Sequence, residues 1–125
     1  MRSATVGGRK LALSFTLDAM DQIERRLGMK FGSETLTESV KDWKKTIAIL
    51  CILARAGAEE RGEDPEEITE AWISKRARPG QLMELQIAVL AAIQDGMKME
   101  TEEAEEGAEE DVVLQELAKK GQGAE

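Results

Sequence analysis

The segment 43–56, WKKTIAILCILARA, constrains the fold more than any other part of the chain. After Thr46, eight consecutive residues carry no charge. Apolar residues at positions 43, 47, 50, 51 and 54 fall on one face of a helix, and those at 49, 52, 53 and 56 fall on the other. A helix that is apolar nearly all round must be covered on more than one side. A membrane span needs about 20 apolar residues, so we expect instead the central helix of a small soluble bundle.

The composition limits both the size of the fold and its chemistry. A chain of 125 residues is expected to form one domain. It contains no histidine, which removes the commonest general base and a favoured metal ligand. The single cysteine, Cys51, lies inside the apolar run, and we interpret it as a buried structural thiol because no histidine can activate it. One cysteine cannot form an internal disulfide, which fits a reducing compartment.

The net charge of −8 is concentrated at the C-terminal end. Residues 98–125 contain ten acidic residues and three lysines, whereas residues 1–97 contain fifteen acidic and fourteen basic residues. Binding to a phosphate backbone normally requires a basic face, so nucleic acid is not expected as a partner. The N-terminus, MRSATVGG, lacks the apolar stretch of a signal peptide, and no membrane partner is expected.

Residues near the N-terminus predict a short β-hairpin. The Gly-Gly pair at 7–8 is a turn signal, and Leu11, Leu13 and Phe15 then alternate with more polar residues as in a half-buried strand. Only residues 4–6 remain upstream to pair with this strand. An isolated hairpin is unstable, so the hairpin must pack on the helices or extend the sheet of a partner, which makes Leu11 and Leu13 candidate partner contacts.

Helical periodicity and its start and stop signals predict four helices. They cover residues 17–27, 36–56, 64–78 and 81–97. Thr35 and Glu38 have the spacing of a capping box for the second helix, which is either continuous or broken near residues 41–44. Residues 57–63, GAEERGE, are expected to form a solvated connection.

Two of these helices are expected to cover the central one. Residues 17–27 would lie on one side and residues 82–93 on the other, with Cys51 buried between them. The last helix has two apolar stripes along its length. One consists of Leu82, Leu85, Val89 and Ile93, and the other of Met83, Ile87 and Leu90.

The C-terminal part of the chain differs sharply in composition. Residues 98–111 contain eight acidic residues and are interpreted as a flexible linker, because they cannot bury enough apolar surface to fold. A short amphipathic segment follows, with Val112, Val113, Leu114 and Leu117. Such a short helix is marginal alone, so we interpret it as an element that docks on a partner or on a second copy. The sequence thus predicts a mainly α fold: a small bundle of about four helices with a short N-terminal β-hairpin over residues 1–97, and an acidic flexible C-terminal tail over residues 98–125.

No catalytic, cofactor or metal site is predicted. Most carboxylates lie in the linker, where nothing fixes their geometry, and EEAEEGAEED lacks the ligand spacing of a calcium loop. Trp43 and Trp72 are most simply residues that anchor helix packing, with interface contacts as the alternative. Both are therefore kept as candidate partner contacts beside the hairpin and the C-terminal segment.

The order of these elements resembles the phage tail assembly chaperones. Residues 5–29, TVGGRKLALSFTLDAMDQIERRLGM, are similar to the opening of that family, which has a Gly-containing turn, a strand ending in an aromatic residue, a Thr or Asn cap and a helix closed by Gly. The apolar helix WKKTIAILCILARAG and the block RPGQLMELQIAVLAAIQDG also resemble the family. So does an acidic stretch followed by VVLQELAKK.

The resemblance implies a non-enzymatic role without a cofactor. Proteins of this family act in the host bacterial cytoplasm, are absent from the mature virion, and bind the tape measure protein of long-tailed phages, keeping it soluble while tail tube subunits assemble around it. Many have a longer form, made by ribosomal frameshifting, whose extra domain is linked to the tail tube protein. Self-association through the hairpin or the C-terminal segment is a further hypothesis. The alternative is a small bacterial helical adaptor or regulator whose acidic tail docks on a basic partner.

Overall fold

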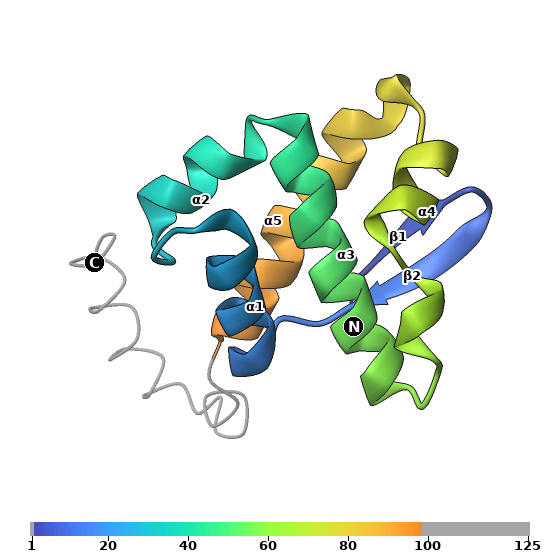
Figure 1. The fold of residues 1–125 in the computed structure, drawn as a ribbon, viewed down its shortest axis with the longest axis horizontal. Helices are drawn as coiled ribbons and strands as arrows, with labels where there is room; N and C mark the ends of the chain where they lie inside the picture. The colour runs from blue at the N-terminus through green and yellow to red at the C-terminus, as the bar shows by residue number, and fades with distance from the viewer. Residues whose placement is uncertain (1, 99–125) are drawn as a thin grey trace, which may run out of the picture.

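The structure, a computed structural model, describes residues 2–98. The predicted linker and the segment 112–117 lie outside the described residues. The described chain is mainly helical, as predicted, with a two-stranded antiparallel hairpin and five α-helices (Figure 1). In order, the elements are β1 (Arg2–Val6), β2 (Arg9–Leu13), α1 (Leu17–Leu27), α2 (Ser33–Val40), α3 (Trp43–Glu60), α4 (Glu70–Arg76) and α5 (Leu82–Met97). Two 3-10 turns, η1 (Pro65–Glu67) and η2 (Pro79–Gln81), precede α4 and α5.

The predicted hairpin forms at the N-terminus and packs on the helices. Its register runs from Arg2 opposite Leu13 to Val6 opposite Arg9. The turn places Gly7 at φ 59° and Gly8 at φ 82°, and the two-residue turn that matches strand twist requires positive φ at both positions. Strand β2 lies against α3 and β1 lies against α5. The hairpin therefore gains its stability from the helical body.

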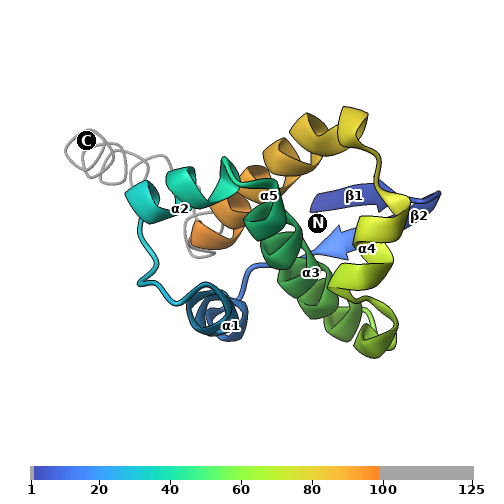
Figure 2. The same cartoon turned by 45° about the horizontal axis from the view of Figure 1, so that its top comes forward.

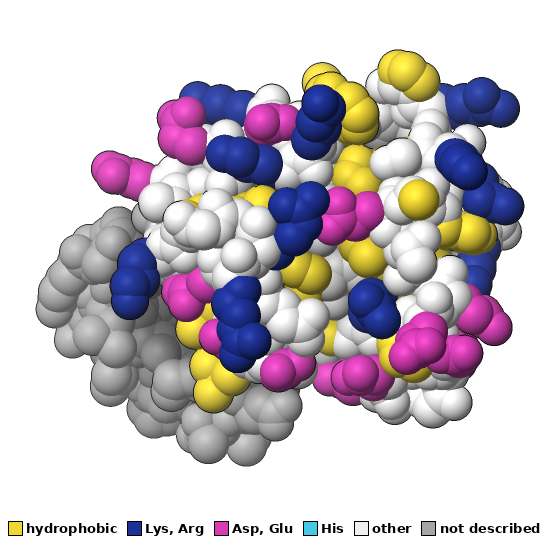
Figure 3. Space-filling model, in the orientation of Figure 1, with side chains coloured by type: hydrophobic (Ala, Val, Ile, Leu, Met, Phe, Trp, Pro, Cys, Tyr) yellow, Lys and Arg dark blue, Asp and Glu magenta, His cyan; other side chains and the backbone are white. Residues whose placement is uncertain are grey.

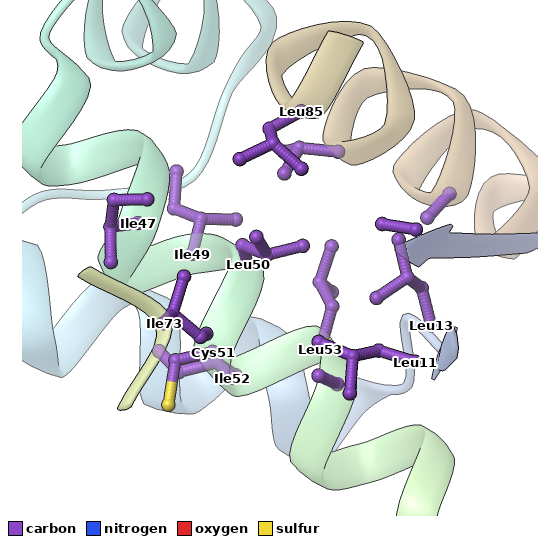
Figure 4. Packing of buried hydrophobic residues seen from close by; sticks show 14 of the residues in the cluster. Leu11, Leu13, Ile47, Ile49, Leu50, Cys51, Ile52, Leu53, Ile73 and Leu85 are labelled. Carbon is purple, nitrogen blue, oxygen red and sulfur yellow. The ribbon is translucent and has the colours of Figure 1, made fainter. Parts of the chain in front are cut away.

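Helix α3 is the centre of the core, as predicted from its two apolar faces. Figures 1 and 2 show α3 running through the middle of the molecule, and both α1 and α5 contact it. Ile49, Leu50 and Leu53 are fully buried, and Cys51 is buried as well (Figure 4). The Leu53 carbonyl also accepts a hydrogen bond from the Ser14 backbone N–H, which ties the chain after β2 to this helix.

The prediction that residues 57–63 form a solvated connection was wrong for its first half. Helix α3 continues to Glu60, and Gly57 and Ala58 are buried. A Cβ atom on Gly57 would overlap the carbonyl oxygen of Ala12 in β2. The missing side chain lets the helix approach the hairpin backbone, so α3 extends over β2 instead of ending before it.

The helix predicted over residues 36–56 is broken, which was one of the two alternatives. Helix α2 ends at Val40, and α3 begins after Asp42, whose side chain accepts a hydrogen bond from the Lys44 backbone N–H. The capping box predicted from Thr35 was wrong. α2 begins at Ser33, and the Thr35 hydroxyl instead donates to backbone carbonyls of the preceding loop.

The side chain of Thr46 links the end of α2 to the start of α3 by hydrogen bonds. This side chain is fully buried, and its hydroxyl lies 3.0 Å from the Val40 carbonyl oxygen and 3.1 Å from that of Asp42. Replacing Thr46 with valine keeps the shape but removes the donor. We expect a loss of about 1–2 kcal/mol in the free energy of unfolding, measured by urea denaturation, because a buried carbonyl loses a partner. Thr46→Ser, which keeps the hydroxyl, should retain more stability than Thr46→Val, and the reverse order would contradict this role.

The predicted helix over residues 64–78 is divided. Asp64 caps only the short turn η1, and Thr69 caps α4 by accepting a hydrogen bond of 3.0 Å from the Trp72 backbone N–H. Between them Ile68 is extended and buried, with 2% of its surface exposed. Ile68 can be buried against the core because its backbone is extended. Thr69 then caps a new helix, α4.

Candidate functional site

Helix α5 carries apolar side chains on its outer face. Met83, Ile87 and Met97 are 70%, 60% and 62% exposed. Met83 and Ile87 lie one turn apart, on the side of the helix away from the buried Leu85 and Val89. Met97 is exposed at the C-terminal end of the helix, four residues after the buried Ile93. Of the first predicted stripe, Leu85, Val89 and Ile93 are buried and Leu82 is half-buried; of the second, Met83 and Ile87 are exposed, whereas Leu90 is half-buried against the core. We call Met83, Ile87 and Met97 the α5 stripe.

Several contacts fix the position of α5. Gln86 donates a hydrogen bond of 2.7 Å to the Val40 carbonyl at the end of α2. The guanidinium of Arg2 donates to both carboxylate oxygens of Asp95, at 2.9 and 3.2 Å, and these hydrogen bonds lower the pKa of Asp95. At Gly96 the helix approaches the backbone of Phe15 so closely that a side chain would overlap it. The α5 stripe is therefore presented on a helix held at both ends.

An apolar cleft of about 420 Å³ lies where α3 begins, α4 ends and α5 begins. In Figure 1 the start of α3, the end of α4 and the start of α5 lie in the upper part of the ribbon. Six of the eight lining residues are apolar. They are Trp43, Ile47, Ala77, Pro79, Leu82 and Leu85. We call this hollow the Trp43 cleft, since the ring of Trp43 is half exposed and forms part of its wall.

One basic side chain, Arg78, lines the Trp43 cleft, and four more belong to residues close in sequence to its lining residues. Lys44 and Lys45 follow Trp43 on α3, Lys75 and Arg76 end α4, and Arg78 lines the cleft. All five are exposed, and none of them forms a salt bridge with a residue in the described part of the chain. Figure 3 shows dark blue side chains beside yellow hydrophobic ones at the upper right of the molecule. The cleft therefore suits a ligand with apolar side chains and negative charge.

The structure separates the residues predicted as partner contacts. Trp43 reaches the surface, with 50% of its area exposed, whereas Leu11 and Leu13 are buried in the core and offer no side-chain surface to a partner. Trp72 is half-buried, and the guanidinium carbons of Arg9 and Arg76 lie 5.7 and 4.8 Å from its ring centroid. Trp72 therefore contributes mainly to packing between the hairpin and α4. The predicted contacts Val112, Val113, Leu114 and Leu117 lie outside the described residues.

Sequence reasoning did not select Met83 and Ile87 as contact residues. The available signal was the second apolar stripe of the last helix, since one helix face normally suffices for a core. Only their exposure in the structure identifies them, because periodicity does not show whether a neighbouring element covers a stripe.

Cys51 is unsuited to nucleophilic chemistry. Its sulfur lies 3.6 Å from the Ile68 carbonyl oxygen, and burial raises the pKa of the thiol to about 11. Since the thiolate is the nucleophile, the group is almost wholly protonated at neutral pH. This agrees with the interpretation of Cys51 as a structural thiol.

Within residues 2–98, no group of three or more His, Cys, Asp or Glu side chains is placed to hold a metal ion. No helix in the same range is long and apolar enough to cross a membrane. The features that stand out are thus two contact surfaces, the α5 stripe and the Trp43 cleft. Comparison of the chain with models of protein families, with curated proteins and with solved structures finds no significant match.

Proposed function

We propose that this protein is a non-enzymatic tail assembly chaperone of a long-tailed bacteriophage. It binds the tape measure protein in the host cytoplasm and keeps it soluble while tail tube subunits assemble around it. The observation that carries the proposal is the α5 stripe, three exposed apolar side chains on one helix of a small body. The resemblance of the sequence to this family supplies the identity of the partner.

The chemistry of the α5 stripe suits a long helical partner. An apolar helix face binds another helix by packing side chains between the ridges of its neighbour. Two of the three residues are methionines, Met83 and Met97, whose flexible thioether chains adapt to non-identical surfaces. A tape measure protein is a long helical rod with many similar but unequal apolar stripes, so one adaptable surface can bind it repeatedly.

The proposal predicts that charge on the α5 stripe abolishes the chaperone effect. Co-expression with a fragment of the tape measure protein should keep that fragment soluble with the wild-type chain. Met83→Glu/Ile87→Glu should lose this effect and the co-purification, with binding weakened at least about 100-fold, because two carboxylates would have to be buried against apolar side chains. The measurements are the soluble fraction of the fragment and the affinity by calorimetry.

Leu17→Glu is the matched control. Leu17 is also an exposed apolar residue, at 80%, but it belongs to α1 and not to the α5 stripe. It should bind like the wild type. Retained binding by the double variant would exclude the α5 stripe as the contact. Failure of the wild-type chain to bind, together with tight and salt-sensitive binding to a basic regulator, would favour the adaptor alternative.

A further inference from the structure

The Trp43 cleft has a composition that defines its ligand. Its walls include Trp43 and Leu82, Arg78 lines it, and the ammonium of Lys44 lies 5.7 Å from the centroid of the Trp43 ring. Neither cation forms a salt bridge with a described residue. Two exposed acidic residues are close in sequence to wall residues: Asp42 precedes Trp43, where its side chain caps α3, and Glu84 follows Leu82 by two residues. A helical peptide with a few aliphatic side chains next to a group of carboxylates would satisfy both the apolar walls and the two cations.

The chain itself contains such a peptide. Residues 109–117, EEDVVLQEL, begin with three carboxylates and continue with aliphatic side chains. In a helix, Val113, Leu114 and Leu117 would lie on one side, because they are three and four residues apart. The segment thus combines an apolar face with a charge opposite to that of the two cations at the cleft.

The connecting chain is long enough to bring this segment to the cleft. Leu82, at the first turn of α5, lines the cleft, and Met97 ends the helix about 22 Å away at 1.5 Å per residue. Residues 99–111 can span about 40 Å when extended. The segment can therefore return along α5 to the cleft of its own molecule.

We propose that residues 112–117 dock in the Trp43 cleft of their own chain. Val113, Leu114 and Leu117 contact the apolar walls, and the carboxylates of Glu109–Asp111 lie beside the cations of Lys44 and Arg78. Tethering supplies an effective concentration of about 1 mM, so a free peptide with a Kd of about 0.1 mM would be about 90% docked when tethered. The tail thereby covers the apolar cleft, and any ligand of the cleft must displace it.

This inference does not rest on the proposed chaperone function, because no residue of the α5 stripe lines the cleft. The test is a proton–nitrogen NMR spectrum of the full-length chain, in which the indole N–H groups of the two tryptophans give two signals. Leu114→Asp/Leu117→Asp should shift the Trp43 indole signal and leave that of Trp72 in place. It should also lower the backbone order of residues 112–117. Adding about 0.5 M NaCl to the wild type should move the Trp43 signal toward its position in the variant, because salt screens the attraction between the carboxylates and the cations.

The control is Gln115→Asp/Gln122→Asp, which adds the same charge to the tail but keeps the aliphatic residues. Its Trp43 signal should stay close to the wild-type position. An identical Trp43 signal in the wild type and in Leu114→Asp/Leu117→Asp would overturn the proposal. A shift that appears only at high protein concentration would overturn it as well, since the tail would then dock on a second copy.

Discussion

Replacing Gly57 with alanine is expected to lower the free energy of unfolding by about 3 kcal/mol, although alanine is the better helix former. In the interior of a helix, alanine should stabilise by about 1 kcal/mol relative to glycine. At this position the added Cβ would overlap the carbonyl oxygen of Ala12 and press on the backbone of Leu13. Because the obstacle is backbone in the hairpin, relief requires moving β2 away from α3. A loss of stability in Gly57→Ala would therefore show that the hairpin backbone packs directly on α3, whereas a gain would show that it does not.

Urea denaturation followed by tryptophan fluorescence measures this effect. Gly80→Ala serves as the control, because a Cβ on Gly80 meets no atom within 4 Å. Its free energy of unfolding should stay within about 0.5 kcal/mol of the wild type. Equal stability of Gly57→Ala and the wild type would show that α3 does not lie this close to β2.

The second large effect is expected at Leu50. Its side chain is fully buried and lies in the middle of the cluster of side chains in Figure 4, where α3 meets the other elements. Leu50→Ala removes buried methylene groups and leaves a cavity, which costs about 2–5 kcal/mol. In a domain of this size, a loss of about 3 kcal/mol lowers Tm by about 12 °C or more.

Comparing the Tm of Leu50→Ala and Leu17→Ala by calorimetry shows how much of the loss is due to burial of the leucine. Both variants truncate leucine in a helix, but Leu17 is 80% exposed. The Tm of Leu17→Ala should stay within a few degrees of the wild type, at a cost of about 0.5 kcal/mol or less. A similar loss in both variants would contradict the central position of Leu50.

The sequence allowed the fold class and its centre to be predicted. The uncharged run after Thr46 indicated a helix covered on several sides, and α1 and α5 contact α3 as expected. The Gly7-Gly8 pair predicted the hairpin turn, and the helix predicted over residues 17–27 is α1, with Thr16 and Gly28 as its caps. These features are local: a cap, a turn and a periodic stripe each depend on residues a few positions apart.

The boundaries that were missed depend on contacts between distant segments. Helix α3 continues through Gly57 because the backbone of β2 lies against it. The chain is extended at Ile68 because this side chain is buried, and Thr69 then caps a separate helix. Neither contact can be recognised from local periodicity. Cap and breaker signals alone therefore placed the end of α3 and the start of α4 wrongly.

The candidate contact surfaces were likewise predicted only in part from the sequence. Sequence periodicity alone identified two apolar stripes on the last helix and left the role of Trp43 open between packing and contact. The tertiary structure decided that Leu85, Val89 and Ile93 are buried while Met83 and Ile87 are exposed, and that Trp43 lines an apolar cleft together with Arg78. The physical reason is that a stripe records which side chains share a helix face, whereas burial depends on which face a neighbouring element covers.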